Sequence, residues 1–173
     1  MIILIAGGTH SGKTVFAQKL LEKHHYPYLS MDHIKMGLIR GGLCPLTPES
    51  DDAELTRLLW PIAREIIKTA VENGQNLIIE GCYIPADYKK DFEADYLEHI
   101  RYVCLVFSER YIQNHHAEIK KHACDIERRM HEEVPPKELL MKEHARNLEL
   151  CEKHGLDHVL IDDVYEINWD PHS

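Results

Sequence analysis

The sequence predicts an α/β fold in which a parallel sheet carries helices on both faces. Short, continuous apolar runs alternate with longer segments whose apolar residues recur every three or four positions. Continuous runs are typical of strands buried on both sides, and the second spacing is typical of amphipathic helices. Alternation of the two along a chain of 173 residues favours a single domain over residues 1–173.

Each element has its own signal. Helices end before proline, which lacks the backbone N–H, and often stop at glycine, so Pro135-Pro136 separates the last two helices. The longest helix starts near Thr47-Pro48, carries an apolar stripe and stops at Asn73-Gly74. Strands are expected at residues 2–6, 28–31, 77–79, 102–107 and 158–161. The other helices are expected at residues 13–24, 32–40, 85–99, 109–132 and 136–154.

The composition disfavours several classes of protein. The net charge is −9, whereas general nucleic-acid binders carry basic patches, so no nucleic-acid partner is expected. The 5 cysteines form no C-x-x-C pair, which is typical of a reduced compartment rather than of a disulfide framework. No apolar run is long enough to span a bilayer. We therefore expect a cytoplasmic protein with no membrane partner, and its oligomeric state stays open.

The residues after the first strand form a complete G-x-x-x-x-G-K-[ST] motif, the P-loop, and a helix follows it. Glycines let successive backbone N–H groups point at phosphate oxygens, and the helix N-terminus adds partial positive charge. In this motif the lysine bridges the β- and γ-phosphates, and the last hydroxyl binds Mg²⁺. The sequence therefore predicts binding of a nucleoside triphosphate and Mg²⁺. The residues of this site are Gly7, Gly8, Thr9, His10, Ser11, Gly12, Lys13 and Thr14.

Polar side chains recur where the other strands end. Asp32, Glu80, Ser108 and Asp162 each follow an expected strand. In parallel sheets, ligands bind outside the carboxyl ends of the strands. These four residues are therefore expected to share one edge of the sheet with the P-loop.

Three stretches of the chain resemble the P-loop small-molecule kinases related to nucleoside monophosphate kinases. That group includes shikimate, gluconate and adenylate kinases and chloramphenicol phosphotransferase. The stretches are the P-loop, residues 29–40, and residues 78–85, whose Glu80-Gly81 resembles the family's acid-glycine turn. In layout the resemblance covers the whole chain. It implies a five-stranded sheet in the order 2-3-1-4-5 within three α/β/α layers, and a helical lid at about residues 108–136.

The resemblance also implies roles on the acceptor side. Asp32 would accept the proton of a substrate hydroxyl or orient that hydroxyl; the alternative is an N-cap of the helix that follows. Arg40 would bind an anionic group of the acceptor, although adenylate kinases place this arginine closer to the acid, or it is an ordinary helix-end cation. Tyr83 would line the same site. Glu80 would hold a Mg²⁺-bound water or a substrate hydroxyl, or would only cap the next turn. Thr14 and Glu80 are thus the expected metal-binding residues.

The expected lid supplies arginines for the transition state. Arg110 comes first, and Arg128 and Arg129 follow. In one straight helix, Arg110 and Arg128 would lie roughly 27 Å apart, too far for both to reach one phosphate. Either the helix breaks near residues 114–116, or only one arginine engages. The expected catalytic set is Lys13, Asp32, Arg110 and Arg128.

Three further features are given weaker interpretations. The histidines at 115, 116, 122 and 131 lack metal-ligand spacing, so no metal site is expected there. Cys82 is expected to be a small buried side chain. Arg146, on the last helix, is the weakest candidate for phosphate binding.

These patterns predict a kinase that transfers the γ-phosphoryl group of ATP to the hydroxyl of a small molecule, with Mg²⁺ as cofactor. Two alternatives stay open: a nucleoside monophosphate as acceptor, and a nucleotide-binding regulatory ATPase that phosphorylates no metabolite. The sequence has no N-K-x-D tetrapeptide of the kind that GTPases use to read guanine. Neither the acceptor nor the preference for ATP over GTP has a readable signal.

Overall fold

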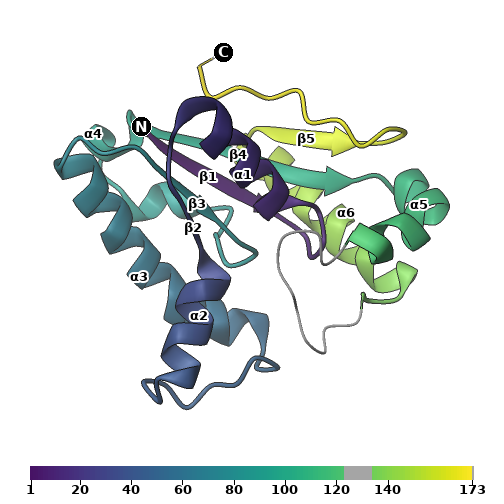
Figure 1. The fold of residues 1–173 in the computed structure, drawn as a ribbon, viewed down its shortest axis with the longest axis horizontal. Coiled ribbons are helices and arrows are strands. Elements are labelled where there is room, and N and C mark those ends of the chain that lie inside the picture. Colours follow the sequence, from purple (N-terminus) through teal and green to yellow (C-terminus); the bar gives the residue numbers. More distant parts are fainter. Residues whose placement is uncertain (123–133, 173) are drawn as a thin grey trace.

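The fold is a five-stranded parallel sheet between two layers of helices (Figure 1). The structure, a computed structural model, describes residues 1–122 and 134–172. The strand order is β2-β3-β1-β4-β5 and every pairing is parallel, which confirms the expected order. The strands are β1 Ile2–Gly7, β2 Tyr28–Ser30, β3 Leu77–Glu80, β4 Ile100–Phe107 and β5 His158–Ile161.

The central strand shows why continuous apolar runs form this sheet. β1 lies between β3 and β4, and every one of its residues is buried. Successive side chains of a strand point to opposite faces. Ile3 and Ile5 join the core on one face, and Ile2 and Leu4 join the core on the other. Both faces of β1 therefore need apolar side chains.

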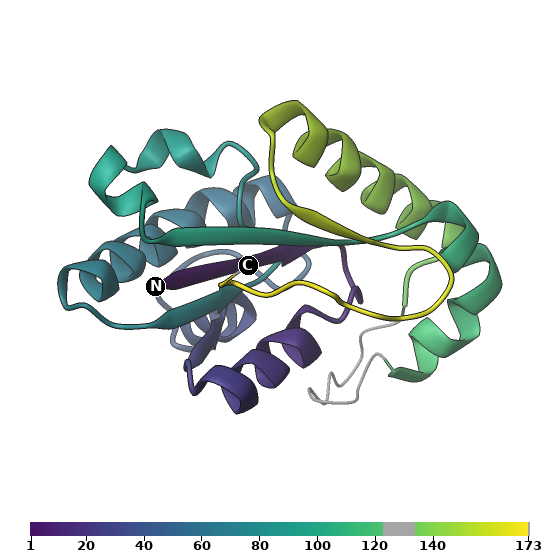
Figure 2. The same ribbon diagram turned by 90° about the horizontal axis from the view of Figure 1, so that it is seen from above.

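Helices cover both faces of the sheet (Figure 2). α1 (Lys13–His24) lies on one face, and α3 (Asp52–Glu72) and α6 (Lys137–His154) lie on the other. α2 (Met31–Arg40) extends from the end of β2, and α5 (Glu109–His122) extends from the end of β4. This arrangement confirms the three α/β/α layers.

The prediction of one helix over residues 85–99 is wrong. The chain there forms a 3-10 turn, Tyr88–Asp91, and the four-residue helix α4, Ala94–Leu97. Tyr88 stacks on Tyr102 with ring centroids 5.3 Å apart, and Phe92, which has extended backbone, meets Trp60 edge-on at 6.1 Å. These tertiary contacts of two large rings override the local preference for a helix.

α3 begins later than predicted. Its N-cap is Asp51, whose carboxylate accepts a hydrogen bond from Ala53 N at 2.9 Å. Thr47 instead belongs to a turn in which its N–H donates to Ser50 Oγ at 2.9 Å. The predicted stop is confirmed, because Asn73 is the C-cap of α3.

Within residues 1–122 and 134–172, neither α3 nor any other helix has the length and apolar character of a membrane span.

α5 has a kink within residues 114–116, which was one of the two alternatives that the sequence left open. His115 has non-helical dihedral angles, φ −116° and ψ 15°. Its ring stacks on Tyr111 with centroids 4.6 Å apart, and its Nδ1 lies 2.6 Å from Glu118 Oε2. The rest of the predicted helix, residues 123–132, lies outside the described residues.

The segment after β5 runs beside α1 and adds to the core on that face. Trp169 meets Phe16 edge-on with ring centroids 6.2 Å apart, and Ile167 packs on the same cluster. Asp170 forms an ion pair with Lys23 near the end of α1. A segment without helix or strand thus covers part of the sheet.

Candidate active site

The P-loop connects β1 to α1 at the carboxyl end of the sheet. Gly7 and Gly12 have φ angles of +145° and +84°, which glycine adopts without the strain of a side chain. α1 begins at Lys13, so the unpaired N–H groups of its first turn lie at the loop. This is the geometry in which a P-loop and a helix N-terminus bind phosphate.

Lys13 is held inside the loop. Its Nζ donates a hydrogen bond to Gly8 O at 2.7 Å, and its side chain is buried. Burial lowers the pKa of Lys13, but the Cys82 thiol and the carboxylates of Glu80 and Glu143 raise it more, so the net direction is upward. The ammonium group therefore stays charged where a polyphosphate would need it.

Glu80 and Thr14 meet beside the loop. Glu80 ends β3, opposite Ile5 of β1, and is 2% exposed. Thr14 Oγ1 donates to Glu80 Oε1 at 3.4 Å. A hydroxyl and a carboxylate suit Mg²⁺, which takes few protein oxygens and completes its shell with water and phosphate. The two residues predicted to bind the metal thus lie together, and their oxygens fit it.

Asp32 and Tyr83, predicted on the acceptor side, are linked by Lys35. Lys35 Nζ lies 2.6 Å from Asp32 Oδ1 and donates to the Tyr83 hydroxyl at 3.0 Å. Burial lowers the pKa of Lys35, but its bonds to Asp32 and Tyr83 raise it more. No motif predicted Lys35; the D-x-x-K spacing, which places both side chains on one side of a helix, was the available signal.

Arg40 lies at the other end of α2. Eight residues of helix separate it from Asp32, about 12 Å along the axis, and its side chain is exposed. The structure therefore does not bring Arg40 to Asp32. Ser30, and not Asp32, is the N-cap of α2, and Asp32 lies in the first turn of that helix.

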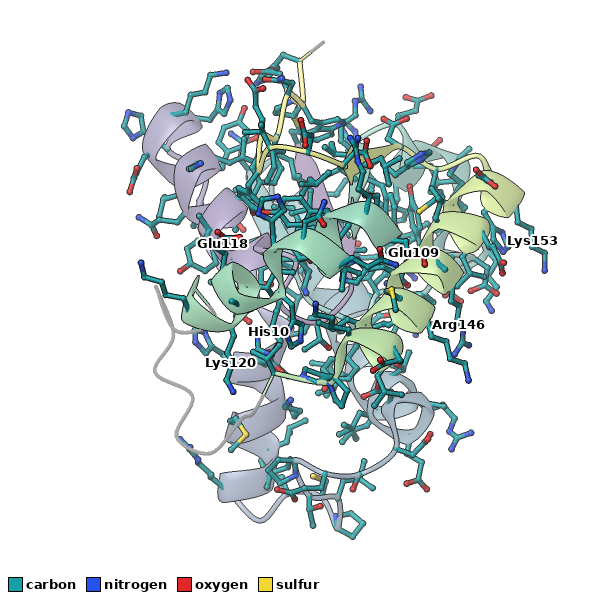
Figure 3. The ribbon with its side chains drawn as sticks, turned by 90° about the vertical axis from the view of Figure 1, so that its right-hand side faces the viewer. His10, Glu109, Glu118, Lys120, Arg146 and Lys153 are labelled. Atoms are coloured by element: carbon teal, nitrogen blue, oxygen red, sulfur yellow. The ribbon has the colours of Figure 1, made fainter. Side chains whose placement is uncertain are left out.

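The predicted arginines lie in three different situations. Arg110, in the first turn of α5, forms an ion pair with Asp162, which follows β5. A phosphoryl group would have to compete with Asp162 for Arg110. Arg128 and Arg129 lie outside the described residues. Arg146 points outward from α6, away from His10 in the P-loop (Figure 3).

α6 makes two contacts with the P-loop that no motif predicted. Thr9 N–H and Thr9 Oγ1 both donate to Glu143 Oε1, at 2.8 and 3.2 Å. The neighbouring His144 is fully buried, and its Nδ1 accepts a hydrogen bond from Phe107 N–H at 2.9 Å. Burial, followed by the charge of Lys13, lowers the pKa of His144 to about 4.

Tyr165 closes the second half of the P-loop. Its hydroxyl donates to Ser11 O at 3.3 Å. A side-chain carbon on Gly12 would fall 1.9 Å from that hydroxyl, so Gly12 is required for space as well as for its φ. Burial raises the pKa of Tyr165 to about 12, so the hydroxyl keeps the proton that it donates.

The structure tests the prediction for Cys82, but only part of the prediction for the histidines. The prediction that Cys82 is buried is wrong, because the residue is exposed. No group of three or more His, Cys, Asp or Glu residues suited to a metal occurs in the described part of the chain. Because His131 lies outside that part, the absence of a metal site among the histidines stays a prediction.

Comparison with solved structures finds the same fold in several proteins that are named as small-molecule kinases. A sugar kinase from Janibacter is 20% identical, with 93% of this chain and 84% of that chain covered and a TM-score of 0.50. Shikimate kinase from Bacteroides thetaiotaomicron is 14% identical, with 94% of this chain and 85% of that chain covered and a TM-score of 0.53. Deoxyadenosine kinase from M. mycoides is 13% identical, with 97% of this chain and 92% of that chain covered and a TM-score of 0.54. No protein-family model matches the sequence, and neither does any curated protein. At these identities the similarity establishes the fold, and function is argued from the site.

Proposed function

We propose that the protein is an ATP- and Mg²⁺-dependent kinase that transfers the γ-phosphoryl group to a hydroxyl of a small molecule. The arrangement of two residue groups at one edge of the sheet carries the proposal. Lys13, Thr14 and Glu80 form the phosphate side. Asp32 and Lys35 form the acceptor side, at the end of β2, which pairs with β3.

The phosphate side binds and orients the triphosphate. Backbone N–H groups of the loop and of the first turn of α1 surround the phosphates. The Lys13 ammonium group has three donors: one is bonded to Gly8 O, and the others can bind phosphate oxygens and offset the charge that spreads over them in the transition state. Thr14 and Glu80 would hold Mg²⁺, which supplies further charge neutralisation when bound.

The acceptor side acts on the attacking group. Tyr83 holds Lys35, and Lys35 holds the Asp32 carboxylate in place. Asp32 then orients the acceptor hydroxyl or accepts its proton. A hydroxyl gains from such a base, whereas a phosphate acceptor is already ionised at neutral pH. The distance of Arg40 from Asp32 also favours a hydroxyl over a nucleoside monophosphate as the acceptor.

The test is an ADP-release assay with Mg-ATP and a panel of acceptors. Sugars, sugar acids, shikimate and deoxynucleosides represent hydroxyl acceptors of the kinds for which the similar structures are named, and nucleoside monophosphates represent the alternative. ADP release that depends on one hydroxyl acceptor and on Lys13 is the expected result. Release with nucleoside monophosphates alone would favour the alternative acceptor. ATP binding without acceptor-dependent release would favour a regulatory ATPase.

Two further predictions accompany this proposal. One is the cytoplasmic location. The other is the lid at about residues 108–136, whose arginines Arg110 and Arg128 are the proposed transition-state contacts.

A further inference from the structure

α6 supports the P-loop through a histidine that the proposed reaction does not use. His144 has no exposed surface. Its Nδ1 accepts the N–H of Phe107 at 2.9 Å, so the neutral imidazole carries its proton on Nε2. Among the described residues, Nε2 makes no hydrogen bond of good geometry, although the Thr9 backbone is close enough to raise the pKa of the ring by less than burial and Lys13 lower it. Buried ring nitrogens usually have partners, so the placement of this one needs a reason.

Nε2 faces the first half of the P-loop. A side-chain carbon on Gly8 would lie 2.8 Å from His144 Nε2 and 3.0 Å from its Cε1. The imidazole therefore occupies the space that any side chain at residue 8 would need. It is also anchored, because Phe107 binds Nδ1 and stacks on the ring with centroids 4.9 Å apart. Gly8 and His144 thus form a complementary pair.

Gly8 is the residue that holds Lys13 in the loop. Its carbonyl oxygen accepts the hydrogen bond from Lys13 Nζ at 2.7 Å. The next residue of the loop, Thr9, binds Glu143 at 2.8 Å, and Glu143 precedes His144 on α6. Two consecutive residues of α6 therefore fix two consecutive residues of the P-loop. A shift of Gly8 would move the group that presents Lys13 to a ligand.

We propose that His144 is a positioning residue for nucleotide binding: its neutral imidazole, anchored on Phe107, fixes Gly8 and through it Lys13. The inference rests on the proposed binding of ATP by the P-loop, and it does not depend on which acceptor is phosphorylated. A neutral ring suits this place, because a second cation would repel Lys13. The role also explains why glycine is present at residue 8, where the motif itself allows any residue.

The test compares substitutions that separate the two ends of the imidazole. His144→Asn keeps an acceptor for Phe107 N–H but does not reach Gly8, and His144→Gln reaches Gly8 with an amide. His154→Gln, in the last turn of α6, is the matched control. The measurements are the dissociation constant of Mg-ATP by isothermal titration calorimetry and the thermal unfolding midpoint of each variant. We expect His144→Asn to weaken Mg-ATP binding about tenfold and His144→Gln to weaken it less.

A double-mutant cycle with Gly8→Ala then tests whether His144 acts on nucleotide binding through Gly8. The added methyl group collides with the imidazole, so Gly8→Ala alone is expected to weaken Mg-ATP binding. In the His144→Asn background the collision is removed, so Gly8→Ala should lower the affinity for Mg-ATP by a smaller factor than it does in the wild-type background. Strictly additive losses would overturn the proposal, and so would an unchanged Mg-ATP affinity in His144→Asn with a lowered unfolding midpoint. If the wild-type protein bound no Mg-ATP, the proposed function itself would be contradicted.

Discussion

The phosphate side and the acceptor side of the candidate site are held together in different ways. On the phosphate side the partners are distant in sequence: Thr9 and Glu143 are 134 residues apart, and Ser11 and Tyr165 are 154 apart. On the acceptor side, Asp32 and Lys35 are neighbours on one helix. The first arrangement depends on the whole fold, and the second depends mainly on α2 and on Tyr83, which accepts a hydrogen bond from Lys35. A disturbance of α6 should therefore reach nucleotide binding, whereas a change in α2 should reach the acceptor alone.

Removing the charge on the phosphate side should have the largest effect. We expect Lys13→Ala to lower ADP release by at least about 10³-fold, because no other buried cation in the described loop replaces it. Steady-state assays with Mg-ATP measure this loss. Lys19→Ala, an exposed position of α1, is the control and should behave as wild type. Full activity of Lys13→Ala would mean that the loop does not bind the phosphates as proposed.

Removing the base on the acceptor side should separate turnover from nucleotide binding. Asp32→Asn should lower turnover by about 10²- to 10³-fold, because the attacking hydroxyl loses its proton acceptor, while Mg-ATP affinity stays near wild type. Turnover and a parallel ATP titration give the two quantities, with Asp52→Asn at the exposed start of α3 as control. Equal losses of turnover and affinity would show that the two sides are not separable.

The support from α6 should make stability depend on pH. The pKa of His144 is lowered from 6.5 to about 4, so between these values the unfolded chain binds a proton that the folded protein does not. The free energy of unfolding should therefore fall as the pH decreases from 6.5 to 4, by roughly 3 kcal/mol in all, and this contribution should not vary above pH 6.5. Urea unfolding at pH 7, 5.5 and 4.5 measures the slope. His144→Asn should show a shallower slope, and an equal slope would contradict the assignment.

The smallest effect is expected from a change of Glu143, whose carboxylate accepts hydrogen bonds from Thr9. In Glu143→Gln an amide oxygen can still accept the Thr9 N–H, but the negative charge near the phosphates is lost. Mg-ATP should therefore bind about 3- to 10-fold more tightly, and the gain should shrink with added salt. Calorimetry at two salt concentrations gives the comparison, with exposed Glu149→Gln as control. Weaker binding would mean that the charged carboxylate itself stabilises the loop for the nucleotide.

The elements that the sequence predicted correctly have local causes. The strands are continuous apolar runs, the P-loop is a contiguous motif, and Glu80 was placed by its position at the end of a strand. The errors have non-local causes. The helix expected at 85–99 is replaced by turns, because Tyr88 and Phe92 pack on rings from elsewhere in the chain. The start of α3 is an exception with a local cause, because the carboxylate of Asp51 accepts the hydrogen bond of Ala53 N–H and caps the helix there.

The same division applies to the candidate site. Lys35 could have been found from its spacing to Asp32, since an interval of three residues places both side chains on one side of a helix. Glu143, His144 and Tyr165 could not, because their contacts with the loop depend on how α6 and the C-terminal segment are brought to it. Sequence motifs thus identify the residues that would meet the ligand, but not those that hold these residues in place.

The packing of Trp169 on Phe16 gives the protein a natural optical probe. The indole touches α1, the helix that continues directly from the P-loop. The other tryptophan, Trp60, lies in the core on the opposite face and donates its Nε1–H to Asp91. A Trp60→Phe variant would leave Trp169 as the one tryptophan, and the fluorescence of its indole would report on the start of α1 without any label.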